Sequence, residues 1–120
     1  MIDHLTLTVK DYARSKAFYA KALAPLGYQV VMEFGEACGL GPQGKPVFWI
    51  HPGAPTTPIH LAFSSPDRET VDAFYGAAME AGARDNGAPG LRPQYHPSYY
   101  GAFVYDPDGH NIEAVCHKPE

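Results

Sequence analysis

Apolar and polar residues alternate along two segments of the chain, residues 3–9 (DHLTLTV) and residues 59–64 (IHLAFS). Alternation of this kind is typical of a strand that buries one face and exposes the other. The two segments therefore predict strands that each carry a histidine opposite their large apolar residues. The apolar positions are Leu5, Leu7 and Val9 in the first segment and Ile59, Leu61 and Phe63 in the second.

A helix is predicted after each of these strands. Asp11 and Asp67 stand where an N-cap side chain would accept hydrogen bonds from the free amides of the first turn. Apolar residues then recur at spacings of three and four, and Gly27 and Gly82 follow as natural helix stops. The predicted buried stripes consist of Phe18, Ala22 and Leu26 in the first helix and Val71, Phe74, Ala78 and Ala81 in the second.

The two strand–helix segments are copies of one another, because residues 4–22 align without a gap on residues 60–78. Three shorter segments with strand character follow each copy, at residues 28–34, 36–40 and 46–51 and at residues 92–96, 100–106 and 111–116. The chain is therefore predicted to be one α+β domain, residues 1–120, of two βαβββ modules. Module one covers about residues 1–52, a linker residues 52–58, and module two about residues 58–118. The identical pairs are His4/His60, Leu5/Leu61, Asp11/Asp67, Ala17/Ala73, Phe18/Phe74, Tyr19/Tyr75 and Ala22/Ala78.

Composition and charge argue against several kinds of partner. The net charge is −4 and the nine Lys and Arg residues are scattered, so no basic surface is predicted that could bind nucleic acid. No apolar run is long enough to span a bilayer, and Asp3 stands where a signal peptide would be basic. Cys38 and Cys116 form no disulfide framework and are expected to be reduced, Cys116 as a core residue. A cytoplasmic protein is the simplest interpretation.

Three polar residues are predicted to project from the face of the sheet that lacks helices. His4 and His60 occupy equivalent strand positions, and Glu113 alternates with Ile112 and Ala114 in the last strand. Two imidazoles and one carboxylate that converge can hold a divalent metal and leave positions open for a substrate. Taken singly, each of the three would more often be a solvated or hydrogen-bonded side chain. The combination favours the metal site, because the repeat maps one histidine on the other and because an unpaired glutamate among apolar strand residues is costly to bury.

The paired histidines, the two helices with the pattern D-x-x-x-x-x-A-F-Y and the ending DPDGHNIEAV resemble the vicinal oxygen chelate superfamily. Its members include glyoxalase I, extradiol dioxygenases, fosfomycin-resistance enzymes and bleomycin-binding proteins. The resemblance implies a cupped, barrel-like mixed sheet with helices on its outer face, and a homodimer that in many members builds each site from two chains. It also implies that His4, His60 and Glu113 are metal ligands, and Glu113 is a candidate catalytic residue as well.

A fourth ligand position is predicted from the two terminal hairpins. When their turns, GPQG and DPDG, are aligned, Phe48 falls opposite Glu113. The resemblance to glyoxalase I would require a second carboxylate there, and Phe48 cannot act as a ligand or base, so it is assigned to the substrate pocket. Trp49 is then predicted to face the helices as a core residue.

The segment from Tyr95 to Tyr105 is rich in aromatic residues and precedes the DPDG turn. Tyr99 and Tyr100 are predicted to line the substrate pocket. His96 is the candidate proton carrier, because imidazole titrates near neutral pH. These rings could equally cover a sheet edge or a dimer contact. The remaining histidines, His51, His110 and His117, are predicted to be surface residues.

The sequence thus predicts a metal-dependent, glyoxalase-like enzyme of the lyase or isomerase type, acting on a small molecule with vicinal oxygens. Two alternatives stay open: an extradiol-type dioxygenase and a non-catalytic, bleomycin-resistance-like binding protein. Zinc, nickel, iron and manganese are all compatible with such a donor set.

Overall fold

Each half of the chain folds as one strand, one helix and three further strands, as the repeat predicts. The structure is a computed structural model, and it describes residues 1–54 and 56–119. Residue 55, in the expected linker 52–58, and residue 120 lie outside the described residues. The elements of the first half are β1 (Leu5–Val9), α1 (Tyr12–Ala22), the short 3-10 helix η1 (Ala24–Leu26), β2 (Gln29–Phe34), β3 (Ala37–Gly41) and β4 (Phe48–Pro52). Those of the second are β5 (His60–Ser64), α2 (Arg68–Glu80), β6 (Arg84–Leu91), β7 (Tyr100–Tyr105) and β8 (Asn111–Cys116).

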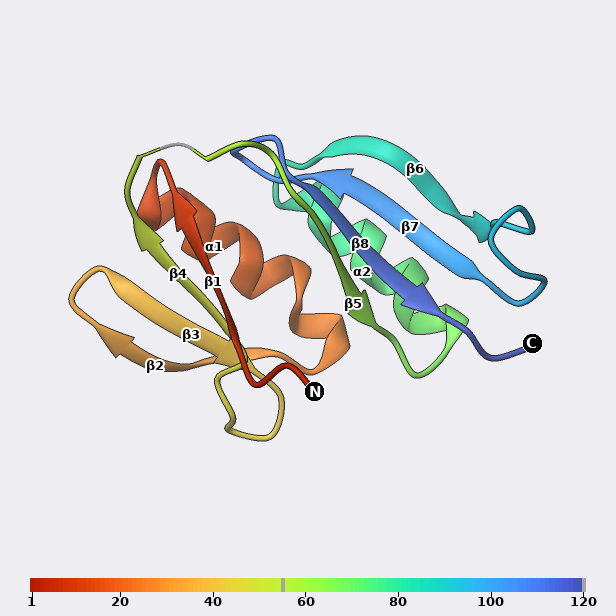
Figure 1. Cartoon of the computed structure of the whole chain (residues 1–120), viewed down its shortest axis with the longest axis horizontal. Helices are drawn as coiled ribbons and strands as arrows, with labels where there is room; N and C mark the ends of the chain where they lie inside the picture. Colours follow the sequence, from red (N-terminus) through yellow and green to blue (C-terminus); the bar gives the residue numbers. More distant parts are fainter. Residues whose placement is uncertain (55, 120) are drawn as a thin grey trace.

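The strands form two sheets with the same topology, in the orders β1-β4-β3-β2 and β5-β8-β7-β6. In each sheet the first and last strands of the module pair in parallel, and the other pairs are antiparallel. The edge strands β1 and β5 lie next to each other at the centre of the molecule, and the described residues extend over 43 × 27 × 27 Å (Figure 1). The α+β class and the two βαβββ modules are confirmed, while the two sheets do not close on each other within the described chain.

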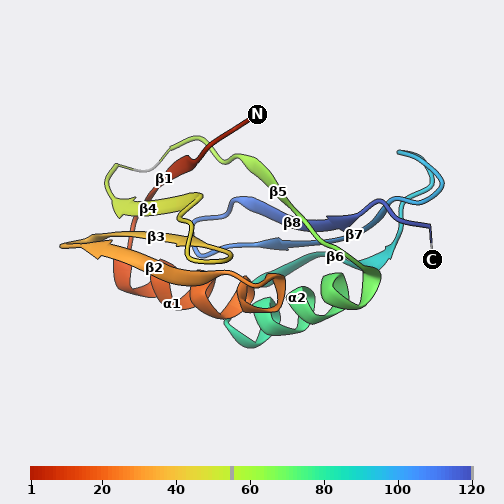
Figure 2. The same ribbon diagram turned by 90° about the horizontal axis from the view of Figure 1, so that it is seen from below.

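Both helices lie on one side of the sheet layer and contact each other (Figure 2). Their first turns are held as predicted, because Asp11 accepts a hydrogen bond from the amide of Arg14 at 3.1 Å and Asp67 one from that of Thr70 at 2.7 Å. The opposite side of each sheet is left uncovered by helices. Within the described part of the chain, no helix is long and apolar enough to cross a membrane.

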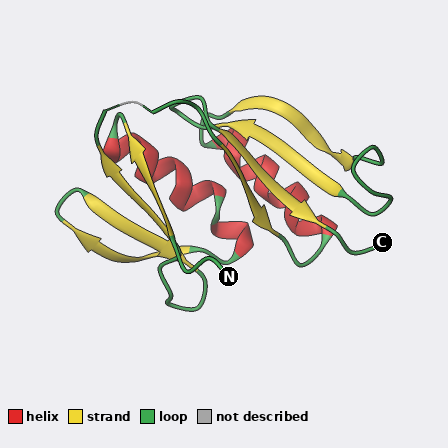
Figure 3. Ribbon diagram, in the orientation of Figure 1, coloured by secondary structure: helices red, strands yellow, loops and turns green. Residues whose placement is uncertain are grey.

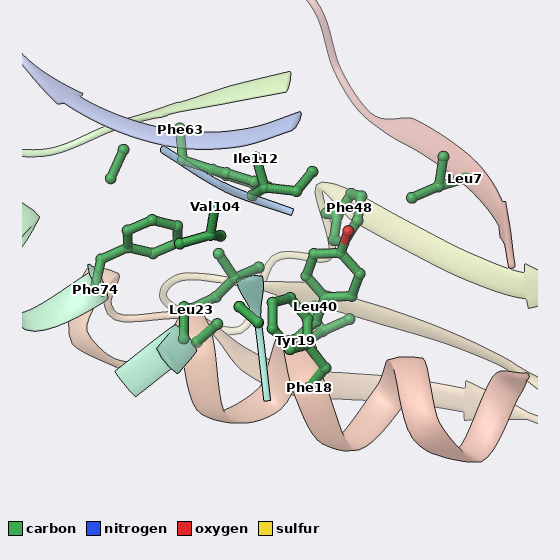
Figure 4. Packing of buried hydrophobic residues seen from close by; sticks show 14 of the residues in the cluster. Leu7, Phe18, Tyr19, Leu23, Leu40, Phe48, Phe63, Phe74, Val104 and Ile112 are labelled. Carbon is green, nitrogen blue, oxygen red and sulfur yellow. The ribbon is translucent and has the colours of Figure 1, made fainter. Parts of the chain in front are cut away.

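One hydrophobic core runs under both sheets and joins the two modules (Figure 4). Phe18 from α1 and Phe74 from α2 are both buried in it, as the helical stripes predict. Phe48 and Phe63, one from each sheet, pack edge to face with ring centroids 5.6 Å apart. Cys116 is 1% exposed, which confirms its expected place in the core.

The sixth strand lies earlier in the chain than the sequence predicts. A strand was expected at residues 92–96, but β6 spans Arg84–Leu91, and the segment before β7 is a loop (Figure 3). The sequence of β6, RDNGAPGL, contains residues that are rare in strands, so propensity gives no signal for it. Its pairing with β7 includes register shifts around Gly87, so tertiary pairing rather than local preference defines this strand.

Candidate functional site

The polar centre of the molecule lies on the helix-free face of the second sheet, around Glu113. The parallel register of β5 and β8 places Ala62 beside Glu113, so that His60, two residues earlier, projects from the same face. His60 Nε2 lies 2.7 Å from Glu113 Oε1, and the Tyr99 hydroxyl donates a hydrogen bond to Glu113 Oε2. The Glu113 side chain has no exposed surface, whereas that of His60 is 53% exposed. A buried carboxylate thus meets a solvent-accessible imidazole.

Tyr99 keeps the second oxygen of Glu113 occupied. Burial, followed by the hydrogen bond to Glu113, raises the pKa of the Tyr99 hydroxyl well above its usual range. The hydroxyl therefore stays protonated and acts as a donor at neutral pH. This contact fixes the orientation of the carboxylate and leaves Glu113 Oε1 directed at His60.

Phe103 forms the apolar floor beside this pair and was not singled out from the sequence. The antiparallel register of β7 and β8 pairs Phe103 directly with Glu113, and the ring centroid lies 6.1 Å from that of His60. The signal for it was present, because alternation along YGAFVY puts Gly101 and Phe103 on one face. What the sequence did not show was that this face belongs to the site.

The loop before β7 places His96 at the rim of the centre and not in contact with Glu113. His96 Nε2 lies 2.6 Å from Nδ1 of His117, and the two rings stack with centroids 4.9 Å apart. The His96 ring also lies 5.5 Å from that of Tyr99, which separates it from Glu113. The Ser98 amide donates to His96 Nδ1 at 3.1 Å, so the neutral imidazole carries its proton on Nε2 and donates it to His117. His117 is exposed, as predicted, but it has a partner that the sequence did not reveal.

His4 lies away from the Glu113 centre in a single chain. It directly precedes β1, and its Nδ1 lies 2.8 Å from Asp3 Oδ1, with 54% of its side chain exposed. Strands β1 and β5 belong to different sheets and run in opposite directions (Figure 1), so the histidines at their starts lie at opposite ends. Among the described residues, no three His, Cys, Asp or Glu side chains gather as a metal site would require.

The strand register corrects the predicted fourth ligand position by one residue. Leu5 pairs with Phe48 in the first sheet and its copy Leu61 pairs with Ile112 in the second, so Trp49 and not Phe48 is the counterpart of Glu113. The prediction that Trp49 faces the helices is therefore wrong. Trp49 is partly buried on the helix-free face, where it stacks on Phe34 with ring centroids 6.2 Å apart.

Phe48 instead packs in the core, as Figure 4 shows, with 1% of its surface exposed. It lines an apolar cavity of about 170 Å³ between the two sheets, together with Ile2, Leu5, Tyr28, Val47, Leu61 and Phe63.

Two other aromatic or histidine side chains also point away from the Glu113 centre. The Tyr100 hydroxyl donates to Asp72 of α2 at 2.6 Å, on the helix side of the sheet. His110 was predicted to be a surface residue and is only 2% exposed, which overturns that prediction. Its Nδ1 accepts a hydrogen bond from the amide of Ile59 at 3.0 Å, and this contact ties the start of β5 to the turn before β8.

The donor set around Glu113 is compatible with a divalent metal. Such ions take imidazole nitrogen and carboxylate oxygen ligands at about 2.0–2.2 Å, so two ligands at right angles lie about 3 Å apart. The 2.7 Å between His60 Nε2 and Glu113 Oε1 is close to that spacing. The two atoms are therefore spaced as neighbouring ligands would be, although two ligands alone make an incomplete site.

The family model of the Glyoxalase/Bleomycin resistance protein/Dioxygenase superfamily matches residues 1–114. The chain belongs to this superfamily. The matched range ends just after Glu113 and includes the DPDGHNIEA segment that carries it. None of the curated proteins matches the chain.

Solved structures of the superfamily share the fold. A glyoxalase/bleomycin resistance protein from Albidiferax ferrireducens is 27% identical with a TM-score of 0.81, and the match covers 95% of this chain and 97% of that one. A glyoxalase/bleomycin resistance protein/dioxygenase family enzyme from Burkholderia phytofirmans is 20% identical with a TM-score of 0.75, covering 98% of both chains. A variant of the fosfomycin resistance protein FosX from Listeria monocytogenes, complexed with Mn(II) and 1S,2S-dihydroxypropylphosphonic acid, is 22% identical with a TM-score of 0.72, covering 96% and 88%.

Proposed function

We propose that this superfamily member is a metal-dependent enzyme of the lyase or isomerase type, acting on a small molecule with two vicinal oxygens. The observation that carries the proposal is the 2.7 Å approach of His60 Nε2 to Glu113 Oε1 on the helix-free face. The FosX structure with Mn(II) supports a divalent ion, and zinc, nickel, iron or manganese suits a nitrogen and oxygen donor set. When bound, the ion would polarise the oxygens of the substrate as a Lewis acid.

The third ligand, His4, is proposed to come from a second copy of the chain in a homodimer. His4 and His60 stand at the starts of β1 and β5, and because these strands run in opposite directions (Figure 1) the two starts lie far apart in one chain. Alternation with Leu5 and Leu61, which pack against the core, puts both histidines on helix-free faces. A symmetric dimer that brings these faces together would place His4 of one copy near His60 and Glu113 of the other. Each of the two sites would then be built from both chains.

The chain's own residues are proposed to orient and move protons as follows. The Tyr99 hydroxyl donates to Glu113 Oε2 and thereby holds the carboxylate with Oε1 towards His60. Phe103 excludes water from one side of the pair. His96 is the proposed proton carrier, because its ring lies against Tyr99 and its hydrogen bond to His117 offers the proton a partner.

Cys38 and Cys116 are both unpaired and buried, which supports a cytoplasmic location.

The first test is the metal content of tag-free, anaerobically purified protein, measured by elemental mass spectrometry. Wild-type protein should hold about one ion per chain, and His4→Ala, His60→Ala and Glu113→Ala should each lose it. His51→Ala is the control, because among residues 1–54 and 56–119 this exposed histidine of β4 bonds only the carbonyl of Pro52. Wild-type protein that stays empty after incubation with the four ions would refute the enzyme proposal, and bound iron would favour the dioxygenase alternative.

Mixing two variants that have each lost the metal tests whether the site is built from two chains. If His4 acts across a dimer, exchange between His4→Ala and His60→Ala chains rebuilds one complete site in each mixed dimer, and metal content recovers to about a quarter of wild type. If each site lies within one chain, mixing restores nothing. That result would contradict the two-chain arrangement while leaving metal binding intact.

The second candidate function is a binding protein without catalysis. The stacked pair Phe34 and Trp49, 6.2 Å apart on the helix-free face, could hold a planar aromatic ligand. The single tryptophan makes this testable. A ligand with a planar aromatic part, such as bleomycin with its bithiazole, that quenches Trp49 fluorescence equally in wild type and in Glu113→Ala would favour this alternative over a metal-dependent enzyme.

A further inference from the structure

Arg92, at the start of the loop between β6 and β7, extends across the floor of the Glu113 centre. Its guanidinium carbon lies 5.2 Å from the centroid of the Phe103 ring, and the His60 ring lies 6.1 Å from the same centroid. The guanidinium and the imidazole are therefore no farther apart than these two distances combined. A small molecule can contact both groups at once.

The glycines of β6 make room for this guanidinium. A Cβ atom on Gly90 would lie 3.2 Å from Arg92 Nη1, and one on Gly87 would lie 3.1 Å from Arg92 Nη2. Both approaches are tighter than ordinary van der Waals contact, so the side chain rests directly on the backbone of the strand. The unusual composition of β6, which hid it from sequence-based prediction, thus gives Arg92 its place.

Arg92 has no acidic partner in the described part of the chain. Nη2 donates to the carbonyl oxygen of Ala88 at 2.8 Å, and no carboxylate lies within ion-pair distance of its guanidinium there. Among the described residues no ion pair joins Arg92 to Glu113, whose two oxygens bond His60 and Tyr99 instead.

We propose that Arg92 binds an anionic group of the substrate, a carboxylate or a phosphate-type oxyanion, while the vicinal oxygens face His60 and Glu113. A planar guanidinium fork is suited to such groups, and a half-buried cation over an apolar ring gains more from an anion than one in bulk water. The substrate class is then an acidic, oxygen-chelating small molecule. The position of the vicinal oxygens rests on the proposed function, whereas anion binding by Arg92 requires no metal.

Calorimetric titration of metal-free protein with methylphosphonate and with inorganic phosphate, at neutral pH and low salt, tests the anion site. Arg92→Gln should weaken binding at least about tenfold, since a hydrogen bond to a charged group contributes about 1.5–3 kcal/mol. Arg84→Gln is the matched control, because Arg84 also stacks on a ring of β7, Tyr105, at 4.9 Å. The neutral ester dimethyl methylphosphonate should not distinguish wild type from Arg92→Gln. Equal binding of the anions by wild type and Arg92→Gln, or no binding by wild type, would overturn the proposal.

Gly90→Ala separates a placed guanidinium from a general effect of charge. The new Cβ would meet only the far end of the Arg92 side chain, so the fold should persist while the guanidinium is displaced. Anion binding should weaken in Gly90→Ala although the charge is kept. Unchanged affinity would mean that Arg92 acts only through its long-range field, which contradicts a defined site.

Mn(II) titrations of the same variants distinguish failure of this inference from failure of the proposed function. Arg92→Gln should bind Mn(II) as wild type does. Loss of anion binding in Arg92→Gln together with no Mn(II) binding by wild type would sustain the Arg92 site and refute the metal-dependent enzyme. Normal Mn(II) binding with undiminished anion binding in Arg92→Gln would refute the Arg92 site alone.

Discussion

The two modules share one backbone plan but carry opposite chemistry on their helix-free faces. In the first module the cross-strand pair of β3 and β4 is Gly39 with Trp49, and in the second the equivalent pair of β7 and β8 is Phe103 with Glu113. The bulky ring of the pair lies on the last strand, β4, in the first module and on the neighbouring strand, β7, in the second. Where the first module has its indole, the second has a carboxylate, and the ring of the neighbouring strand supports it from the side.

The consequence is one apolar face and one polar face in the same chain. Phe34, stacked on Trp49, is 62% exposed, so the first face presents aromatic surface to solvent. The second face presents His60 and Arg92 around the buried Glu113. If a dimer brings the apolar face of one copy against the polar face of the other, each site lies between the Phe34 and Trp49 rings and the His60 and Arg92 side chains. Such a site suits a ligand with an apolar part and an anionic part.

Glu113→Ala, which removes the carboxylate that distinguishes the second module from the first, should have the largest effect on metal binding and stability. It removes a proposed ligand and leaves Tyr99 and His60 without their acceptor, so we expect Mn(II) affinity to fall at least about a hundredfold and the free energy of unfolding by about 1–3 kcal/mol. Metal titration and urea denaturation measure the two effects. Glu113→Gln, which keeps the shape and one acceptor, should retain more stability. Equal stability losses in both variants would mean that packing and not the hydrogen bonds holds the centre.

Gly39→Ala should strain the first module. The added Cβ would lie 2.8 Å from both the Trp49 ring and Pro46, neither of which can easily move, and overpacking of this kind costs about 1–3 kcal/mol. Gly101→Ala in β7 is the comparison, because its Cβ would lie 3.1 Å from Glu113 Oε2 and 3.2 Å from the Tyr99 ring. Urea denaturation should show a smaller loss for Gly101→Ala, accompanied by weaker Mn(II) binding. A larger loss for Gly101→Ala would reverse this ranking.

Trp49→Glu should make the first face resemble the second. If the helix-free face of one copy covers the Glu113 centre of another, the new carboxylate becomes a fourth ligand, and Mn(II) affinity should rise about tenfold. Trp49→Gln, of similar size but uncharged, is the control for loss of the indole. Identical Mn(II) affinities in the two variants would place position 49 outside the metal site.

The smallest expected effect is the pH dependence contributed by Tyr99. Because its pKa is raised in the folded state, its contribution to stability is complete below the usual tyrosine pKa of about 10 and is lost as pH rises towards the folded value. The stability of wild-type protein should therefore fall more steeply above pH about 10 than that of Tyr99→Phe. Unfolding measured across alkaline pH checks this, and Glu113→Gln should bring the ultraviolet titration of Tyr99 to lower pH. Identical slopes for wild type and Tyr99→Phe would contradict the burial argument.

Much of the fold could be predicted because its signals are local. The alternation around Leu5 and Leu61 and the Asp11 and Asp67 caps depend only on near neighbours in the chain, and the structure confirms them. The stripe of the first helix is confirmed only in part, because α1 ends at Ala22 and Leu26 lies in η1, where it is not buried. The β6 strand could not be predicted, because its glycines and proline oppose a strand and only pairing with β7 imposes one.

The sequence analysis assigned the fourth ligand position to Phe48 instead of Trp49 because the two terminal hairpins differ in length by one residue. Phe48 follows Gly44 by four positions, whereas its true counterpart Ile112 follows Gly109 by three, so aligning the turns shifted the strands by one. Since successive side chains of a strand alternate between faces, that shift moved an indole from the open face to the core. Only the register of paired strands reveals such a slip.

The sequence by itself determined the repeat, the class of fold and the faces that His4, His60 and Glu113 occupy, because strand and helix periodicities act over a few residues. The tertiary structure decided which of these side chains meet. Pairing of β5 with β8 brought His60 to Glu113, and the opposite directions of β1 and β5 separated His4 from both. The position of Arg92 over Phe103 likewise depends on the pairing of β6 with β7, since contacts between strands follow from packing the whole chain.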